Sequence, residues 1–200
     1  MNVSDTAVDN SALPGQKSFY YPPGGLLMWI VILLELFTFG IAIVIFMYSG
    51  RQEPEVFHSS AARLDVMMGS VNTVVLLTSG YYMARAVEFY RTGRKLFKTQ
   101  LLLTLLAGLL FIILKSVEYT HKIGQGLTLG SNTFFDFYWM LTGFHLIHVL
   151  TGMVILLWWM YTAHKRPRET ALSHLETGAA FWHLCDLIWL LLFPVLYLIY

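Results

Sequence analysis

Long apolar stretches alternate with short polar ones along the chain from residue 26 to residue 200. Each apolar stretch holds about 20 residues or more, the length of helix that crosses a hydrocarbon layer about 30 Å thick. The pattern therefore predicts an all-α polytopic membrane protein, a bundle of five transmembrane helices. The expected spans are 26–49, 66–87, 97–119, 134–161 and 178–200.

Residues 1–25 are polar and include Asp5, Asp9 and Lys17. They lack the basic start and apolar core of a cleavable secretion signal. The run YPPGG at 21–25 marks the entry to the first span, because proline and glycine interrupt helices. We therefore expect a polar N-terminal tail at 1–25 and one transmembrane domain at 26–200.

Composition supports a membrane protein, since 56% of the residues are hydrophobic and only 12% are charged. The formal net charge of +1 gives no basic field that would indicate a nucleic-acid partner. The one cysteine, Cys185, excludes an internal disulfide and a cysteine-based metal cluster.

Basic residues gather in the loops after the second and fourth predicted spans, whereas the loops after the first and third carry balanced charge. Loops rich in lysine and arginine stay on the cytoplasmic side of a membrane. We therefore expect the N-terminus to be cytoplasmic and the C-terminus to lie outside. The basic residues concerned are Arg91, Arg94, Lys95, Lys165, Arg166 and Arg168.

Few ionisable side chains lie deep in the predicted spans. Each costs at least about 2.5 kcal/mol on insertion scales, so such groups normally face a bundle interior and are candidates for function. They are Glu35 on the first span, His145 and His148 on the fourth, and His183 and Asp186 on the last.

The depth of these groups can be counted at about 1.5 Å per residue from the cytoplasmic end of each span. Glu35 comes out at roughly 13 Å, Asp186 at about 12 Å and His183 at about 8 Å. His148 comes out near 20 Å and His145 near 24 Å. The count predicts that Glu35 meets Asp186 and His183 if the first and last helices are neighbours.

The same count bears on metal binding. A haem held by one histidine from each of two helices needs both rings at one depth, whereas His148 and His183 differ by roughly 12 Å. Two histidines on one span do not alone supply the converging ligands of a non-haem site. We therefore expect no metal and no haem in this chain.

Each polar residue also has a structural explanation. His145 and His148 suit hydrogen bonds between helices. Glu35 is either a neutral acid that donates to a backbone carbonyl or to Asp186, or a group that handles protons. Close packing between helices is the expected role of a further set of residues, Asn72, Gly80, Gly108 and Gly152.

The sequence holds no phosphate-binding glycine loop, no serine-nucleophile elbow and no H-E-x-x-H helix. We therefore expect no catalytic residues of its own. This absence favours a supporting subunit of a membrane complex.

Four segments, in this order, resemble subunit III of the haem-copper oxidases: NTVVLLTSG at 72–80, LLLTLLAGLLFIILKSVEY at 101–119, TGFHLIHVLTG at 142–152 and FWHLCDLIWLLLF at 181–193. With Glu35 in its apolar setting, the likeness covers about the last 175 residues. The chain resembles the short, five-helix form of this family.

The resemblance implies particular residues. Glu35 matches the buried carbodiimide-reactive glutamate of the family, and Glu118 matches an acid that ends a span. His145 and His148 match its paired histidines, although Leu146 stands where a small residue is common. The family's W-H-x-x-D-x-x-W signature is matched by Trp182, His183, Asp186 and Trp189, with packing as the expected role of Trp189.

The resemblance also implies a function. Family members bind no haem or copper; they pack on a catalytic subunit I that does, stabilise it, support its proton uptake, and are linked to bound phospholipid. A respiratory electron-transport complex in a bacterial-type inner (plasma) membrane is the expected setting.

Two other interpretations stay open at this point. Some family members accompany nitric oxide reductase, so this chain would be its accessory subunit or an assembly factor. A different class, a small proton channel or transporter, would use Glu35, Asp186 and the histidines as a relay.

Overall fold

The computed structural model describes residues 25–165 and 167–200. The predicted polar tail at 1–25 lies outside the described residues except for Gly25, and Arg166 of the second basic loop also lies outside them. Within the described ranges the chain is all-α, without strands, as predicted.

Six α-helices follow one another along the described part of the chain. They are α1 (Leu26–Gln52), α2 (Pro54–Ala61), α3 (Val66–Arg91), α4 (Phe97–Gly124), α5 (Thr133–Thr162) and α6 (Arg168–Tyr197), with a short 3-10 turn at Ala163–Lys165 before α6. Four of them, α1, α4, α5 and α6, are long and apolar enough to cross a membrane. The chain is therefore a membrane protein. α3 is 26 residues long but less apolar, so a fifth span is still a prediction.

Side-chain caps explain where two helices begin. The carboxylate of Asp65 accepts a hydrogen bond from the backbone N–H of Met68 at the start of α3. Asn132 does the same for Phe135 at the start of α5. Such caps satisfy backbone donors that have no partner within the helix. Pro54 begins α2, where its missing N–H is not needed.

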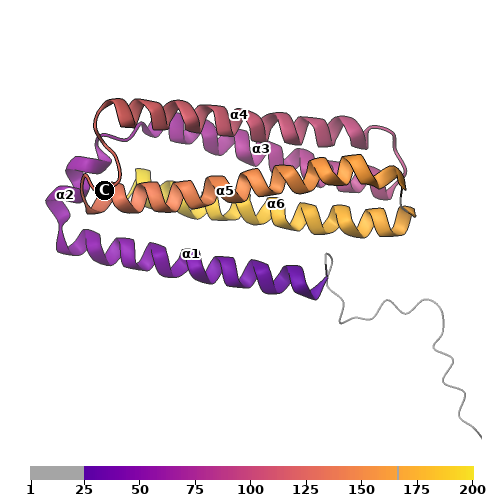
Figure 1. Ribbon diagram of the computed structural model, residues 1–200, viewed down its shortest axis with the longest axis horizontal. Coiled ribbons are helices and arrows are strands. Elements are labelled where there is room, and N and C mark those ends of the chain that lie inside the picture. Colours follow the sequence, from indigo (N-terminus) through magenta and orange to yellow (C-terminus); the bar gives the residue numbers. More distant parts are fainter. Residues whose placement is uncertain (1–24, 166) are drawn as a thin grey trace, which may run out of the picture.

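The long helices run side by side, with α3 and α4 forming one closely packed pair (Figure 1). α6 contacts α3, α5 and α1, and is the most buried of the four candidate spans. α1 lies at the edge of the bundle, and of its residues only Phe39, Phe46 and Gly50 are buried.

Glycines of α4 and α5 make room for a tryptophan side chain of α6. A Cβ at Gly108 would lie 2.7 Å from the Trp182 ring, and a Cβ at Gly152 would lie 2.9 Å from the same ring. Trp182 is fully buried and donates from Nε1 to the Ser79 hydroxyl of α3 at 3.0 Å. One aromatic side chain of α6 therefore joins α3, α4 and α5.

The helix ends correct the depth count. α6 begins at Arg168, ten residues before the predicted start at 178, so His183 lies about 22 Å along its helix and not about 8 Å. α1 begins short of the neighbouring ends of α5 and α6 (Figure 1), so counting from Leu26 places its residues too close to that end. The predicted difference in depth between His148 and His183 is wrong.

Candidate functional site

Glu35 on α1 faces His148 on α5. Glu35 Oε2 and His148 Nε2 are 3.3 Å apart, and the two side chains are 24% and 11% exposed. Within the described part of the chain, Glu35 Oε2 makes no well-aligned hydrogen bond, so the two groups lie at ion-pair distance without one. This contact brings α1 and α5 together where α1 has few other polar contacts.

A second contact fixes how the His148 ring carries its proton. Nδ1 lies 2.8 Å from the carbonyl oxygen of Phe144, an acceptor, so Nδ1–H donates to it. When the ring is neutral, Nε2 is therefore the basic nitrogen, and it points at Glu35. One proton can be held by either group, as Glu35 carboxylic acid beside neutral His148 or as carboxylate beside imidazolium.

Aromatic rings surround the His148 side of this pair. Phe39 and Phe144 contact the His148 ring edge-on, with centroids 5.7 and 4.8 Å away, and Phe181 stacks on it at 6.2 Å. The imidazole therefore lies among aromatic rings, and its side chain is only 11% exposed.

The predicted meeting of Glu35 with Asp186 and His183 is wrong. Although α1 and α6 are in contact, the partner of Glu35 is His148 of α5. The corrected helix ends place His148 and His183 at a similar depth, and their rings separate because one faces α1 and the other faces Gly80 of α3.

His145 lies one turn from His148 and is fully buried. Neither of its ring nitrogens has a hydrogen-bond partner in the described part of the chain, so the expected hydrogen bond between helices is not formed. The ring stacks instead on Trp189 at 5.2 Å and meets the edge of Phe111 at 5.8 Å. His145 thus packs as an aromatic ring.

Glu118 belongs to a buried ionic network that the sequence reading missed. Lys115 Nζ lies 3.0 Å from Glu118 Oε2, and the two side chains are only 1% and 2% exposed. Glu118 Oε1 accepts from Tyr138 of α5 at 2.8 Å and from Tyr197 of α6 at 2.6 Å. The carboxylate therefore joins three helices.

The ammonium of Lys115 is equally well surrounded. It lies 2.8 Å from the Tyr197 hydroxyl and 3.2 Å from the Tyr138 hydroxyl. Four aromatic rings, those of Tyr119, Tyr138, Trp189 and Tyr197, have centroids within 4.9 to 5.4 Å of it. Such rings stabilise a cation that has lost its water. A lysine three residues before Glu118 in an apolar run was the signal available in the sequence.

His183 and Asp186 form a pair of their own on α6. His183 Nδ1 is 3.3 Å from Asp186 Oδ2, and the side chains are 45% and 8% exposed. A Cβ at Gly80 of α3 would clash with the Asp186 carboxylate, so glycine makes room for it. Asp186 Oδ1 is buried and has no donor among the described residues.

The remaining predicted packing residues lie between α3 and α6. Trp189 donates from Nε1 to the Thr73 hydroxyl of α3 at 2.9 Å. Asn72 is fully buried, and its side-chain amide has no partner in the described ranges.

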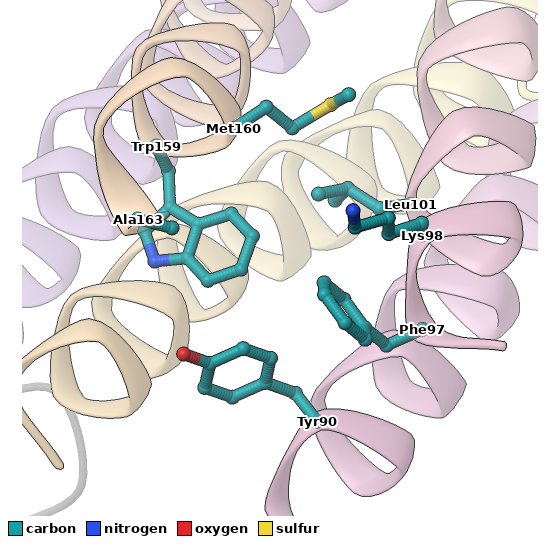
Figure 2. A pocket seen from close by; sticks show the side chains of 7 residues that line it. All are labelled: Tyr90, Phe97, Lys98, Leu101, Trp159, Met160 and Ala163. Atoms are coloured by element: carbon teal, nitrogen blue, oxygen red, sulfur yellow. The ribbon is translucent and has the colours of Figure 1, made fainter. Parts of the chain in front are cut away.

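A cavity of about 450 Å³ opens between the ends of α3, α4 and α5 (Figure 2). Tyr90 meets Phe97 and Trp159 edge-on, with ring centroids 5.0 and 5.3 Å apart. Six of the seven lining residues are aromatic or apolar and the seventh is Lys98; the lining comprises Tyr90, Phe97, Lys98, Leu101, Trp159, Met160 and Ala163.

No three histidine, cysteine, aspartate or glutamate side chains converge on a point within 25–165 and 167–200. The ionisable groups occur instead as pairs or with tyrosines. These arrangements can hold or pass a proton and can join helices.

Residues 25–200 match the family model described as cytochrome c oxidase subunit III. This chain belongs to that family. The predicted resemblance to subunit III of the haem-copper oxidases is therefore confirmed.

Individual relatives of this subunit III chain agree. It is 29% identical to cytochrome c oxidase subunit 3 of Synechocystis over 143 residues, 68% of this chain and 58% of the relative. It is 27% identical to heme-copper oxidase subunit I+III of Aeropyrum pernix over 181 residues, 86% of this chain and 22% of the relative. The chain thus spans less than two thirds of the length of these two relatives.

A third relative matches along most of both chains. This subunit III chain is 23% identical to the probable quinol oxidase subunit 3 of Staphylococcus saprophyticus over 180 residues, 86% of each chain. These three relatives are named as oxidase subunits, and the names give no support to the nitric oxide reductase alternative.

Proposed function

We propose that this chain is a non-catalytic subunit III of a respiratory haem-copper terminal oxidase, which packs on the catalytic subunit I and stabilises it. Membership of the subunit III family carries this proposal. The relative from Aeropyrum pernix, named subunit I+III, supports it further, because fusion in one chain keeps two parts side by side. Haem and copper would belong to subunit I.

We also propose a membrane topology of five spans, α3 included, in a bacterial-type inner (plasma) membrane. The end of the bundle at the α3–α4 loop carries Arg91, Arg94, Lys95 and Lys98, which favours the cytoplasmic side for that end. The N-terminus would then be cytoplasmic and the C-terminus outside. A Lys95→Cys variant in a Cys185→Ser background should react with an impermeant thiol reagent in inverted vesicles and not in intact cells.

The Glu35–His148 pair is the proposed element for proton uptake. A single proton held between a carboxyl and an imidazole, partly exposed at the bundle edge, can exchange with a partner that covers that edge. In the purified complex, Glu35→Gln should slow proton uptake. Glu88→Gln, at an exposed ion pair with Arg85, is the matched control and should leave it unchanged.

A phospholipid is the proposed occupant of the cavity in Figure 2. Its aromatic wall suits an acyl chain, and Lys98 at the basic end suits a phosphate. Native mass spectrometry should detect less retained lipid for Lys98→Gln than for Arg51→Gln at the opposite end of the bundle.

Purification of the tagged chain in mild detergent tests the main proposal. A haem protein should accompany it in fixed ratio, and the reduced-minus-oxidised visible spectrum should report haem. Recovery of the chain alone and colourless from membranes that contain the oxidase would overturn the proposal. A ratio far below one to one would point to an assembly factor instead.

A further inference from the structure

We propose that Phe39 is the positioning residue of the Glu35–His148 pair: its ring holds α1 against α5 so that the Glu35 carboxyl group stays opposite Nε2 of His148. This inference rests on the proposed function and deepens it, because it names the residue that controls how closely the two proton-holding groups approach.

α1 and α5 run in opposite directions, which creates two matched levels between them (Figure 1). Glu35 and Phe39 are four residues apart on α1, and Phe144 and His148 are four residues apart on α5. Residues at this spacing lie one above the other on a helix face. Glu35 therefore meets His148 at one level, and Phe39 meets Phe144 at the next.

The Phe39 ring fits against two rings of α5 at once. Its centroid is 5.7 Å from that of Phe144 and 5.7 Å from that of the His148 imidazole, and these two centroids are 4.8 Å apart. The three rings thus form a triangle. Because Nδ1–H of His148 also donates to the Phe144 carbonyl oxygen, the imidazole is fixed in place and in rotation.

Phe39 is the most tightly packed residue of α1 near the pair. It is only 2% exposed, whereas every earlier residue of α1 is exposed or partly buried. The next buried residue of the helix, Phe46, lies about 10 Å further along its axis. The packing of Phe39 therefore holds α1 at the distance from α5 at which Glu35 reaches His148.

The distance matters for proton exchange. A proton passes between two groups that come within hydrogen-bonding reach, so a small displacement of α1 changes how the pair holds its proton. Two further titratable groups lie near the pair, His145 of α5 and Cys185 of α6, and both stay unchanged in the variants below.

The pH profile of carbodiimide labelling at Glu35 tests this role. The reagent attacks a protonated carboxyl group, so the profile reports the proton that Glu35 holds, and mass spectrometry of peptides from the purified complex measures the label. Phe39→Leu removes the ring, and His148→Leu removes the partner outright. Phe46→Leu is the matched control, since Phe46 is equally buried on the same helix and packs at the other end against Phe57 and Phe134.

Phe39→Leu should shift the midpoint of the labelling profile in the same direction as His148→Leu, by more than half as much. Phe46→Leu should keep the wild-type midpoint, although the loss of a buried ring lowers its thermal unfolding temperature. A merely structural role of Phe39 would lower the unfolding temperature and leave the midpoint in place.

Three outcomes would overturn the inference. The first is a wild-type midpoint in Phe39→Leu. The second is an equal shift in Phe39→Leu and Phe46→Leu, because the effect would then belong to α1 as a whole. The third is an unshifted midpoint in His148→Leu, since the pair would then share no proton.

Phe144→Leu decides the case in which Phe39→Leu does not fold. The Phe144 side chain is 45% exposed, so its loss should be tolerated, and it removes one of the two rings that Phe39 packs against. A midpoint shifted in the direction of His148→Leu would support the inference, and a wild-type midpoint would overturn it.

Proton uptake by the purified complex separates this inference from the proposed function. Slower uptake in Glu35→Gln together with a wild-type midpoint in Phe39→Leu would overturn this inference alone. A shifted midpoint in Phe39→Leu together with unchanged uptake in Glu35→Gln would overturn the proton-uptake role, and Phe39 would still position the pair. With both in place, Phe39→Leu should slow uptake and Phe46→Leu should not.

Discussion

Two groups of ionisable side chains occupy the same bundle and differ in how completely they are satisfied. At Glu118, both carboxylate oxygens are used, and Lys115 has an acceptor, two hydroxyls and four rings around it. At Glu35, the one ion-pair partner among the described residues is the His148 imidazole, and 24% of the Glu35 side chain is exposed. The first arrangement suits a fixed joint between helices, and the second suits a proton that moves.

Two tyrosine hydroxyls complete the hydrogen bonding between Lys115 and Glu118. Tyr138 and Tyr197 come from α5 and α6, and each hydroxyl lies between the Lys115 ammonium and the Glu118 carboxylate. A hydroxyl accepts and donates at once, so it can serve both ions. These additional hydrogen bonds help to offset the cost of taking both charges out of water.

The largest expected effect comes from breaking that network. Lys115→Met leaves Glu118 buried without a counter-ion, so the folded bundle should lose about 3–5 kcal/mol, measured as a lower thermal unfolding temperature in detergent. The double variant Lys115→Met with Glu118→Leu removes both charges and should lose less than Lys115→Met alone. A double variant less stable than the single one would show that the ion pair is not what holds the three helices.

Close packing of α5 against α6 holds His148 opposite Glu35, so weakening this packing is expected to have the second-largest effect. Gly152→Ala places a methyl group 2.9 Å from the Trp182 ring and should destabilise the chain by about 1–3 kcal/mol. Gly143→Ala on the same helix is the matched control, because its Cβ would meet no atom within 4 Å apart from its own stretch of helix backbone. The control should be neutral or slightly stabilising, since alanine favours helix over glycine. Equal losses for both variants would contradict the packing explanation.

Much of this fold follows from the sequence, and the errors have identifiable causes. The lengths of the apolar stretches predicted where α1, α4 and α5 begin to within one residue. The helices end up to five residues later than predicted, because polar residues continue them. The same prediction missed the first ten residues of α6, Arg168 to Thr177, because polar residues there extend the helix beyond the apolar segment. A helix needs no apolar side chains to continue into the headgroup region, so hydropathy underestimates its length.

Predicting which ionisable residues meet required the correct helix ends. Pairing of Glu35 with His148 needs the relative offset of α1 and α5, and no pattern within either helix encodes it. Lys115 was missed for a different reason, since a lysine near the end of a span is usually explained by snorkelling toward the interface. Its complete burial depends on tyrosines 23 and 82 residues away in the chain.

The smallest effect on stability is expected at Glu35. Its contact with His148 is 3.3 Å long without a well-aligned hydrogen bond, and glutamine keeps a polar group of the same size there, so Glu35→Gln should unfold close to the wild-type temperature. The chemical contrast with Glu118 should nevertheless be large. A membrane-soluble carbodiimide reacts with a protonated carboxyl that it can reach, so it should label Glu35 at the open edge of α1. Glu118 should stay unlabelled, because it is 2% exposed and both its oxygens already have partners, Lys115 at Oε2 and two tyrosine hydroxyls at Oε1.

Mass spectrometry of peptides from the labelled chain measures how much label Glu35 and Glu118 carry. The Lys115→Met variant tests whether access or the ion pair protects Glu118. That variant removes the ammonium that faces the Glu118 carboxylate. Labelling of Glu118 should then rise only if burial permits access. Labelling of Glu118 in the wild type at the level of Glu35 would remove the distinction between a closed network and an open pair. Labelling confined to Glu35 in both variants would assign the difference to access, with the charge on Glu118 playing no part.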